Sequence, residues 1–493
     1  MAVIQAPRAK ATLVGSCVLL LAMSTTSCGG GSSTSKVPPA GNPLPSLISF
    51  TPFNATAGGA GFSLTLNGSG FASNASVMWN GNALPTTFVS SNQLTAQVTA
   101  SDIAAAGIAQ ITVSNPAPGG GASNVFRFGV NPASPAANFL YASNFADNTI
   151  SGYSVDPNSG VLTALNGSPF TASSSATNPG PMGMDRLGKF LYVVNSPNVA
   201  CKGCMNFAGF TPNSSGDLTP LAESPLFALA PLSFVGDPTG NILYDAGGQG
   251  ASQGADIVTM LIDANSGNLT PIADSPGFDE FVAMALNPAG TFIYGASTGV
   301  AGPPTGGVWV GSISPTSGAV TLVAKPPRGG LGVSALTVHP SGKFLFAVND
   351  NGGGIPSSTL LSYTINPTTG ALTLLNSIPY DAPVLLGDVV VHPNGGFLYV
   401  SDGDDNVLGF SIDGNGDLTA LAGSPFSAGG SVINTNFLAM DPAGRFLYAA
   451  NYDAGFTSNI SAFTVDSNSG ALALVPGSPF PAGAGPDAIV IAP

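Results

Sequence analysis

Short apolar runs separated by turn residues fill most of this chain. The clearest run reads GKFLYVVNS at residues 188–196, and close copies follow at 342 (GKFLFAVND), 396 (GFLYVSDG) and 444 (GRFLYAANY). Apolar residues occupy consecutive positions in these runs and do not alternate with polar ones. This pattern is typical of strands buried on both faces, so we expect sheets that are covered on each side by other sheets.

One aromatic position of this pattern recurs seven times. The spacing is about 51 residues, a period in the range of four-stranded propeller blades. The seven positions are Tyr141, Tyr192, Tyr244, Tyr294, Phe346, Tyr399 and Tyr448. Each unit contains an inner strand, a Pro-x-Gly turn, the repeated strand, a third strand and an outer strand. We therefore predict an all-β fold with a seven-bladed β-propeller over residues 137–493.

The two ends of the repeat region complement each other. The first unit lacks an inner strand before Phe139, whereas the last unit continues beyond its Ser-Pro-Phe ending into PDAIVIAP at residues 486–493. An open ring would leave two sheet edges unpaired, which folded proteins avoid. The C-terminal strand is therefore predicted to pair with the strand around Tyr141 and to close the propeller.

Residues 47–131 follow a different pattern, in which apolar and polar positions alternate within short runs. About seven such runs at this spacing predict an immunoglobulin-like β-sandwich. Trp79, which stands before the Asn80-Gly81 hairpin turn, is the expected core anchor. The stretches TPFNATAGGAGFSLTLNGSGF, VMWNG and ITVSNPAPGGGASNVFRFGV resemble an IPT/TIG domain. This resemblance implies a spacer or a protein-binding surface.

The repeated strand also resembles a known family. YVVN, YASN, YAAN and FAVN, set in P-x-G-(K/R)-F-L-Y units, resemble the YVTN-repeat and lactonase-type seven-bladed propellers, which include bacterial 6-phosphogluconolactonases. In the lactonase-type enzymes we look for a Pro-Arg-His triplet that opens an inner strand and an Asn-Glu pair after the repeated strand. The corresponding triplets here are PDA at 486, GDV at 387, VSA at 333 and PLS at 231, and no repeated strand is followed by Asn-Glu. The resemblance to the lactonase-type enzymes therefore assigns no catalytic residue in this chain.

The polar residues near the starts of the inner strands are the candidate ligand contacts. They are Asp388, Asp487, Ser334 and Ser233. Inner strands line the axis of a propeller, so these side chains are expected at the mouth of the central channel, where carboxylates without a basic partner suit a small cationic or sugar-like ligand.

Histidine and acidic clusters offer two further candidate sites. His339 and His392 precede Pro-x-Gly turns, in a column that holds Asp237, Asn287 and Asp441 elsewhere, so we expect turn contacts in preference to metal binding or base catalysis. Three acids crowd one connection of the sixth blade: Asp402, Asp404 and Asp405. Calcium binding and a solvated acidic turn both remain open there, and no other cofactor is expected.

The N-terminus has the pattern of an export signal. Arg8 and Lys10 precede an apolar run that ends at Met23, and small residues lead to Cys28. Cys28 resembles the acylated cysteine of a bacterial lipoprotein, with Thr25 where that motif usually has leucine. We therefore predict a signal over residues 1–28, lipidation at Cys28 and a flexible tether over residues 29–46. Ordinary cleavage after Ser24, which would give a secreted protein, is the alternative.

The composition limits which binding partners and which cysteine chemistry we expect. With 25 acidic and 11 basic residues, the net charge of −14 disfavours nucleic acids and anionic membranes, so membrane attachment is expected only through the lipid anchor. Cys201 and Cys204 are the cysteines left in the mature chain, and in an exported protein a local disulfide is favoured over a redox or zinc role. We expect a monomer.

These observations favour a cell-envelope or periplasmic propeller that acts as a binding or interaction module, for an envelope protein or a small sugar-like ligand. The missing Arg-His and Asn-Glu pairs argue against catalysis. A lactone hydrolase resembling 6-phosphogluconolactonase and a structural envelope protein without a specific ligand are the alternatives.

Overall fold

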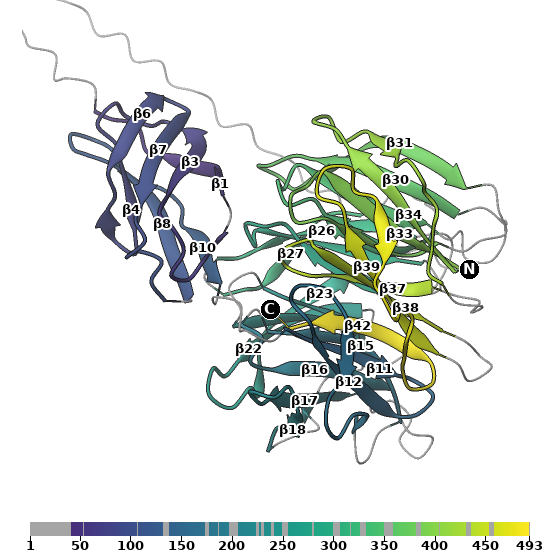
Figure 1. The fold of residues 1–493 in the computed structure, drawn as a ribbon. Helices are drawn as coiled ribbons and strands as arrows, with labels where there is room; N and C mark the ends of the chain where they lie inside the picture. Colours follow the sequence, from purple (N-terminus) through teal and green to yellow (C-terminus); the bar gives the residue numbers. More distant parts are fainter. Residues whose placement is uncertain are drawn as a thin grey trace, which may run out of the picture. The chain divides into compact units, whose positions relative to one another are not determined.

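Every regular element in the described part of the chain is a β-strand (Figure 1). No helix there is long and apolar enough to cross a membrane. The computed structural model describes residues 41–52, 54–105, 107–131, 138–172, 177–185, 187–196, 206–222, 226–227, 231–237, 241–248, 255–278, 281–298, 306–315, 317–325, 332–349, 358–380, 386–403, 405–429, 435–452 and 458–492. The export signal, the lipidation site Cys28, most of the tether and the Cys201–Cys204 pair lie outside these residues.

The N-terminal domain is a two-sheet sandwich, as predicted. One sheet contains β1 (Ser46–Thr51), β3 (Phe62–Ser69), β7 (Gln93–Val98) and β6 (Thr86–Ser90); the other contains β2 (Asn54–Thr56), β10 (Phe126–Asn131), β8 (Gly107–Asn115), β4 (Ser76–Trp79) and β5 (Asn82–Ala83), with β9 (Gly121–Ala122) paired to β8. Trp79 is the expected core anchor, with its ring 5.0 Å from that of Phe128. Asn80 and Gly81 adopt φ values of 50° and 82°, as a tight hairpin turn requires.

Seven sheets follow, one for each predicted unit, and we number them as blades 1 to 7. The first four, written from the axis outward, are blade 1 with β42 (Pro486–Ile491), β11 (Asn138–Asn144), β12 (Thr149–Val155) and β13 (Leu162–Ala164); blade 2 with β15 (Thr177–Met184), β16 (Leu191–Ser196), β17 (Asn206–Pro212) and β18 (Leu218–Pro220); blade 3 with β20 (Pro231–Gly236), β21 (Ile242–Gly248), β22 (Ala255–Ile262) and β23 (Leu269–Phe278); and blade 4 with β24 (Ala283–Leu286), β25 (Phe292–Ser297), β26 (Gly307–Ile313) and β27 (Val320–Ala324).

The last three are blade 5 with β28 (Val333–Val338), β29 (Phe344–Asn349), β30 (Ser358–Ile365) and β31 (Leu372–Tyr380); blade 6 with β32 (Leu386–Val391), β33 (Phe397–Asp402), β34 (Asn406–Ile412) and β35 (Leu418–Ala420); and blade 7 with β37 (Thr435–Met440), β38 (Phe446–Asn451), β39 (Asn459–Val465) and β40 (Leu472–Leu474). Four two-residue strands also pair with third strands: β14 (Phe170–Thr171), β19 (Leu226–Phe227), β36 (Phe426–Ser427) and β41 (Phe480–Pro481). All six residues are buried in each of β25, β29, β33 and β38, which confirms burial on both faces.

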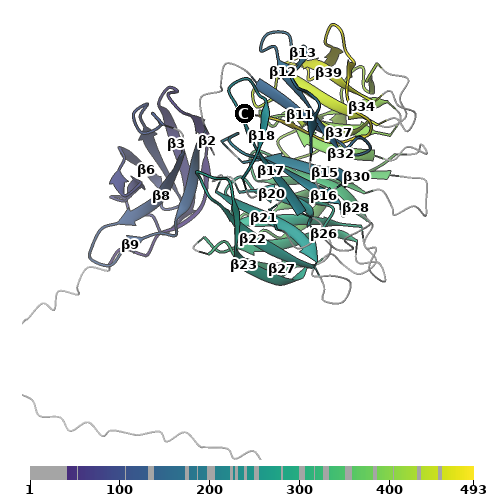
Figure 2. The same cartoon turned by 90° about the horizontal axis from the view of Figure 1, so that it is seen from below.

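The C-terminal strand closes the propeller. β42 pairs antiparallel with β11, and Tyr141 lies opposite Val490. In Figure 1 the yellow β42 lies with the blue strands of blade 1, and Figure 2 shows β12 and β13 beside β39 of blade 7. The inner strands contact one another in the order β15, β20, β24, β28, β32, β37 and β42, and β42 contacts β15. The predicted ring of seven blades is therefore confirmed.

The recurring aromatic position joins five of the seven blades to the blade that follows. Five tyrosine hydroxyls donate to a glycine carbonyl in the outer turn of the following blade: Tyr141 to Gly216 (2.6 Å), Tyr192 to Gly267 (2.7 Å), Tyr294 to Gly370 (3.3 Å), Tyr399 to Gly470 (2.7 Å) and Tyr448 to Gly160 (3.0 Å). The last of these connects blade 7 to blade 1. Each buried hydrogen bond contributes about 1 kcal/mol and also fixes the orientation of neighbouring blades.

The Ser-Pro-Phe ending also has a structural role. In blades 1, 6 and 7 its serine hydroxyl accepts a hydrogen bond from a backbone N–H of the third strand, at a point where the outer strand has ended. The pairs are Gly152 N to Ser168 Oγ, Gly409 N to Ser424 Oγ and Ala462 N to Ser478 Oγ, at 2.9–3.0 Å. The motif therefore satisfies a donor that the short outer strand leaves unpaired.

Candidate functional site at the inner strand starts

The inner strands begin with an irregularity that the sequence did not reveal. Among the described blades, β15, β20, β28, β32, β37 and β42 each show a shift of register against the second strand near their first residues. A β-bulge inserts an extra residue and changes the direction of a side chain, and bulges are frequent beside binding and active sites. Residues at this end of the propeller are therefore placed by bulges as well as by simple strand alternation.

The bulges divide the four predicted ligand contacts into two columns. Asp487 and Ser334 are the inserted residues of β42 and β28, between the paired positions on either side. Asp388 and Ser233 belong to the next column, which contains Ala488 in β42 and Ala335 in β28. The four side chains therefore do not occupy equivalent positions on their inner strands.

At the end of the propeller where the inner strands begin, the carboxyl group of Asp487 remains available to bind a ligand. It is half-buried, and the structure gives it no hydrogen-bond or ion-pair partner among the residues it describes. Burial raises its pKa to about 6. A side chain added at Gly180 on β15 would place its Cβ 3.4 Å from Asp487 Oδ2, so the carboxyl lies directly over the glycine backbone of blade 2. A side chain at position 180 would therefore contact this carboxyl.

Asp388 has a structural role. Its Oδ1 accepts the N–H of Val389 (2.8 Å), and its Oδ2 accepts the N–H of Leu438 on β37 (3.0 Å). Burial raises its pKa to about 6, although these hydrogen bonds oppose the rise. Its own N–H donates to Ser401 Oγ at 2.7 Å. Asp388 therefore ties blade 6 to blade 7, and both of its carboxylate oxygens are already occupied.

The two serines differ in the same way. Ser233 is buried, and its hydroxyl donates to the carbonyl of Phe281 at 2.8 Å, which joins blade 3 to the start of blade 4. Ser334 is half-buried and makes only a long contact of 3.5 Å, to the carbonyl of Val348 in its own blade. Ser334 is therefore the freer of the two hydroxyl groups.

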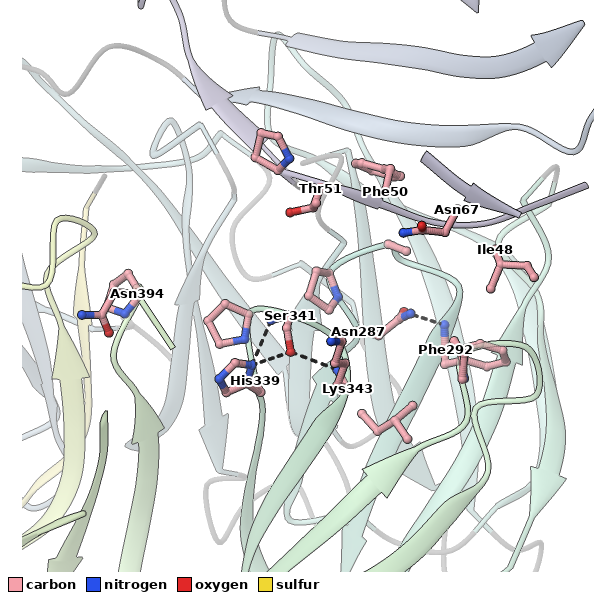
Figure 3. Close-up of a pocket in the computed structure, with 18 residues that line it drawn as sticks. Ile48, Phe50, Thr51, Asn67, Asn287, Phe292, His339, Ser341, Lys343 and Asn394 are labelled. Atoms are coloured by element: carbon pink, nitrogen blue, oxygen red, sulfur yellow. Dashed lines mark hydrogen bonds between the residues drawn. The ribbon is translucent and has the colours of Figure 1, made fainter. Parts of the chain in front are cut away.

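Both histidines lie at the other end of the blades. The inner strand before each one spans about 20 Å at 3.3 Å per residue. Nε2 of His339 contacts the carbonyl of Gly395, and Nε2 of His392 contacts that of Gly444, each at 2.8 Å in the turn of the next blade. Figure 3 shows His339 bonded to Ser341, whose N–H and hydroxyl lie 3.0 and 2.7 Å from Nδ1. The expected turn contacts are therefore present, and burial lowers the pKa of His339.

The acidic turn of blade 6 is organised by its own residues. Asp402 Oδ1 accepts the N–H of Asn406 at 2.8 Å, and Oδ2 accepts its side-chain amide at 3.2 Å. Asp405 adopts a left-handed φ of 69°, and Asp404 lies outside the described residues. Within the described chain, no group of three or more histidine, cysteine, aspartate or glutamate side chains could hold a metal ion.

Two polar features of the propeller were not predicted from the sequence. The asparagine that ends the repeated strand is buried in several blades and closes the hairpin to the third strand. In blade 7, for example, the Asn451 amide donates to Asn459 and Ser461, each at 2.7 Å. The other feature is Asp245, which is fully buried on β21. It could have been noticed as the only charged residue in a column of small apolar side chains.

Comparisons with known proteins agree with this architecture. The IPT/TIG domain model matches residues 45–128, and the model of the lactonase seven-bladed beta-propeller matches residues 243–361 and 356–485. A search of curated proteins found no match.

Solved structures with the same fold include three propellers. A proposed 6-phosphogluconolactonase from Bacteroides fragilis is 18% identical and covers 74% of this chain and 100% of its own, with a TM-score of 0.56. A second, from Bacteroides uniformis, is 17% identical, with coverages of 72% and 99% and a TM-score of 0.57. The periplasmic gluconolactonase of Pseudomonas aeruginosa is 17% identical, with coverages of 72% and 99% and a TM-score of 0.55. At these identities the structural likeness shows the fold alone. The two family models show that the chain has an IPT/TIG domain followed by a propeller of the lactonase seven-bladed beta-propeller family.

Proposed function

We propose that the inner strand starts of this propeller form a binding site for a small, uncharged, polyhydroxylated ligand, and that Asp487 is its main contact. The observation that carries this proposal is the state of the Asp487 carboxyl. It is half-buried and without a partner in the described chain, and it lies on a bulge of the strand that closes the ring. A carboxylate in such a place can accept two hydroxyl hydrogen bonds from a sugar-like molecule.

The charge of the site argues for an uncharged ligand over a phosphorylated one. No lysine or arginine in the described chain is paired with Asp487 or Asp388. Two of the described cations instead bind groups in turns at the far end of the blades: Lys189 contacts the carbonyl of Ala264, and Arg445 binds Asp441. Among the described residues, a phosphate monoester would therefore meet carboxylates that no cation neutralises, in a protein of net charge −14.

Hydrolysis of an unphosphorylated lactone is the second candidate, and the pKa of Asp487 favours it. A general base works best when its pKa lies near the working pH, and Asp487 has a pKa of about 6. The ionised carboxyl would take a proton from a water molecule whose oxygen forms a bond to the lactone carbonyl carbon. The ring C–O bond would then break, and the proton would pass to the leaving alkoxide to give a hydroxy acid.

The site would act outside the cytoplasm. The export pattern at the N-terminus and the flexible tether support a protein held at the cell envelope through Cys28, with the sandwich as a spacer and the Cys201–Cys204 pair as a local disulfide. A periplasmic relative of the same fold is compatible with this location.

The experiment measures binding and turnover in the same proteins. The full mature chain is titrated with D-glucono-δ-lactone, its 6-phosphate and neutral monosaccharides by calorimetry, and lactone opening is followed by proton release. Asp487→Asn should weaken binding of the neutral ligands at least tenfold, since one charge-assisted hydrogen bond contributes about 1.5–3 kcal/mol.

Asp388→Asn is the matched control, because its carboxyl also has a pKa of about 6 but bonds to the backbone of blade 7. It should lower the melting temperature and leave binding unchanged. Turnover that rises through pH 6 and disappears in Asp487→Asn would establish the hydrolase. Equal binding by the parent and Asp487→Asn, or a preference for the phosphorylated lactone, would contradict the proposed site.

A further inference from the structure

Asp245 breaks the pattern of the repeated strand. It follows Tyr244 on β21, at a position where the other six blades carry small apolar residues. These residues are Ala142, Val193, Gly295, Ala347, Val400 and Ala449. Aspartates in the turns of this propeller recur at equivalent positions in several blades, whereas a carboxyl at this strand position occurs in blade 3 alone.

The position lies inside the contact between blades 2 and 3. Asp245 has no exposed surface, and its register partners on the flanking strands are Phe234 and Val258. Leu243, two residues earlier on the same side of β21, packs in a cluster with Tyr192, Phe207 and other apolar side chains of blade 2. The carboxyl therefore shares its face of the sheet with an apolar cluster.

Neither oxygen of this carboxyl has a hydrogen-bond partner among the residues that the structure describes. A buried ionised carboxyl without a partner is strongly unfavourable, so the group is stable here only while it holds a proton. Burial accordingly raises the pKa of Asp245 to about 8, with no opposing contribution from a cation. Asp245 thus differs from Asp388, whose oxygens accept two backbone N–H groups.

The other titratable groups of this contact do not compensate Asp245. Asp256 lies two residues before Val258 on β22. On the blade 2 side, the Tyr192 hydroxyl is engaged with the carbonyl of Gly267, and Asp185 accepts the N–H of Phe190 at 2.6 Å. β20 contributes no titratable side chain. The titratable groups named on these described strands are thus acids or a tyrosine, and Lys189, a cation at the same contact, is bonded to the carbonyl of Ala264.

We propose that the contact between blades 2 and 3 is a pH-sensitive joint, which is tightly packed while the Asp245 carboxyl is protonated and loosens when that carboxyl ionises. Loosening would admit water to the apolar cluster and would make this contact the first to open under alkaline conditions.

The direction of the effect follows from proton linkage. An aspartate in the unfolded chain ionises near pH 4, whereas Asp245 in the folded chain keeps its proton up to about pH 8. The contribution of Asp245 to stability is therefore complete below pH 4 and is lost as the pH rises toward 8. In this interval the unfolding equilibrium constant should increase by up to about tenfold per pH unit because of this one proton.

The test compares the parent with Asp245→Val, which introduces the residue of blades 2 and 6, between pH 6.5 and 8.5. Denaturant unfolding of the parent should show the rising equilibrium constant, and Asp245→Val should remove it and be the more stable protein at pH 8. Asp256→Asn, on the neighbouring strand, is the matched control and should keep the pH dependence of the parent. Parallel pH profiles for the parent and Asp245→Val would overturn the proposal.

Two measurements do not depend on the folding of the valine variant. The parent at pH 7 should show the infrared carbonyl band of a protonated carboxyl, and Asp245→Asn should lack that band. Hydrogen exchange, corrected for its intrinsic pH dependence, should accelerate above pH 8 in β16 and β21 but not in β29 and β33 of blades 5 and 6. A carboxyl already ionised at pH 7, or uniform acceleration in all four strands, would refute a local joint.

Discussion

The substitution Gly160→Ala tests the closed ring at its closing contact. Gly160 lies in the outer turn of blade 1 with a φ of 73°, and an added Cβ would stand 2.4 Å from Cδ1 of Phe446 in blade 7. The left-handed backbone costs alanine roughly 1–2 kcal/mol, and forcing extra volume against a packed ring costs roughly 1–3 kcal/mol more. The sum is a loss of about 2–5 kcal/mol in the free energy of unfolding.

Gly342→Ala is the matched control that measures the cost of the left-handed backbone alone. Its φ is 69°, and its added Cβ would meet Pro288 Cδ at an ordinary contact distance of 3.5 Å. This variant should therefore lose only about 1–2 kcal/mol. Since 1 kcal/mol corresponds to about 2 °C in a large domain, calorimetry should place Gly160→Ala several degrees below the control. Equal melting temperatures would show that Phe446 does not pack on the turn of blade 1, and the closing contact would be wrong.

Two further predictions concern the same closure. Deleting residues 487–493 removes the partner of β11 and exposes a strand buried on both faces, so the truncated chain should aggregate and lose its cooperative melting; an unchanged melting temperature would disprove closure by β42. Tyr448→Phe removes the hydrogen bond to Gly160 and leaves its buried carbonyl without that donor, which should cost about 1–3 kcal/mol in denaturant unfolding, whereas no measurable loss would show that the hydroxyl is not engaged.

Much of the architecture could be predicted from the sequence because each blade repeats the same pattern of strands and turns. The period of the aromatic anchors gave the number of blades, and the unmatched inner strand at each end of the repeat region gave the closure, since an unpaired edge is unfavourable. The histidine columns were also interpretable, because a position shared by histidine, aspartate and asparagine indicates a turn contact.

The candidate site was only partly predictable. Asp487 and Asp388 each follow the first residue or two of an inner strand and look equivalent in sequence, but the bulges shift them into different columns. One carboxyl is left open, and the other is bonded to the backbone of the next blade. A bulge depends on how two strands pair, so the pattern of one strand cannot reveal which residue is the extra one.

The sequence by itself determined the all-β class, the repeat, the order of the domains and the strand that closes the ring, because these depend on periodicity and on edges that must be paired. Only the tertiary structure decided which acids are available. Asp388 is bonded to the N–H of Leu438, which is 50 residues away in the sequence. The carboxyl of Asp245 keeps its proton because its face of the strand packs against an apolar cluster that includes residues of another blade. The protonation and bonding of a side chain depend on neighbours that only folding brings together.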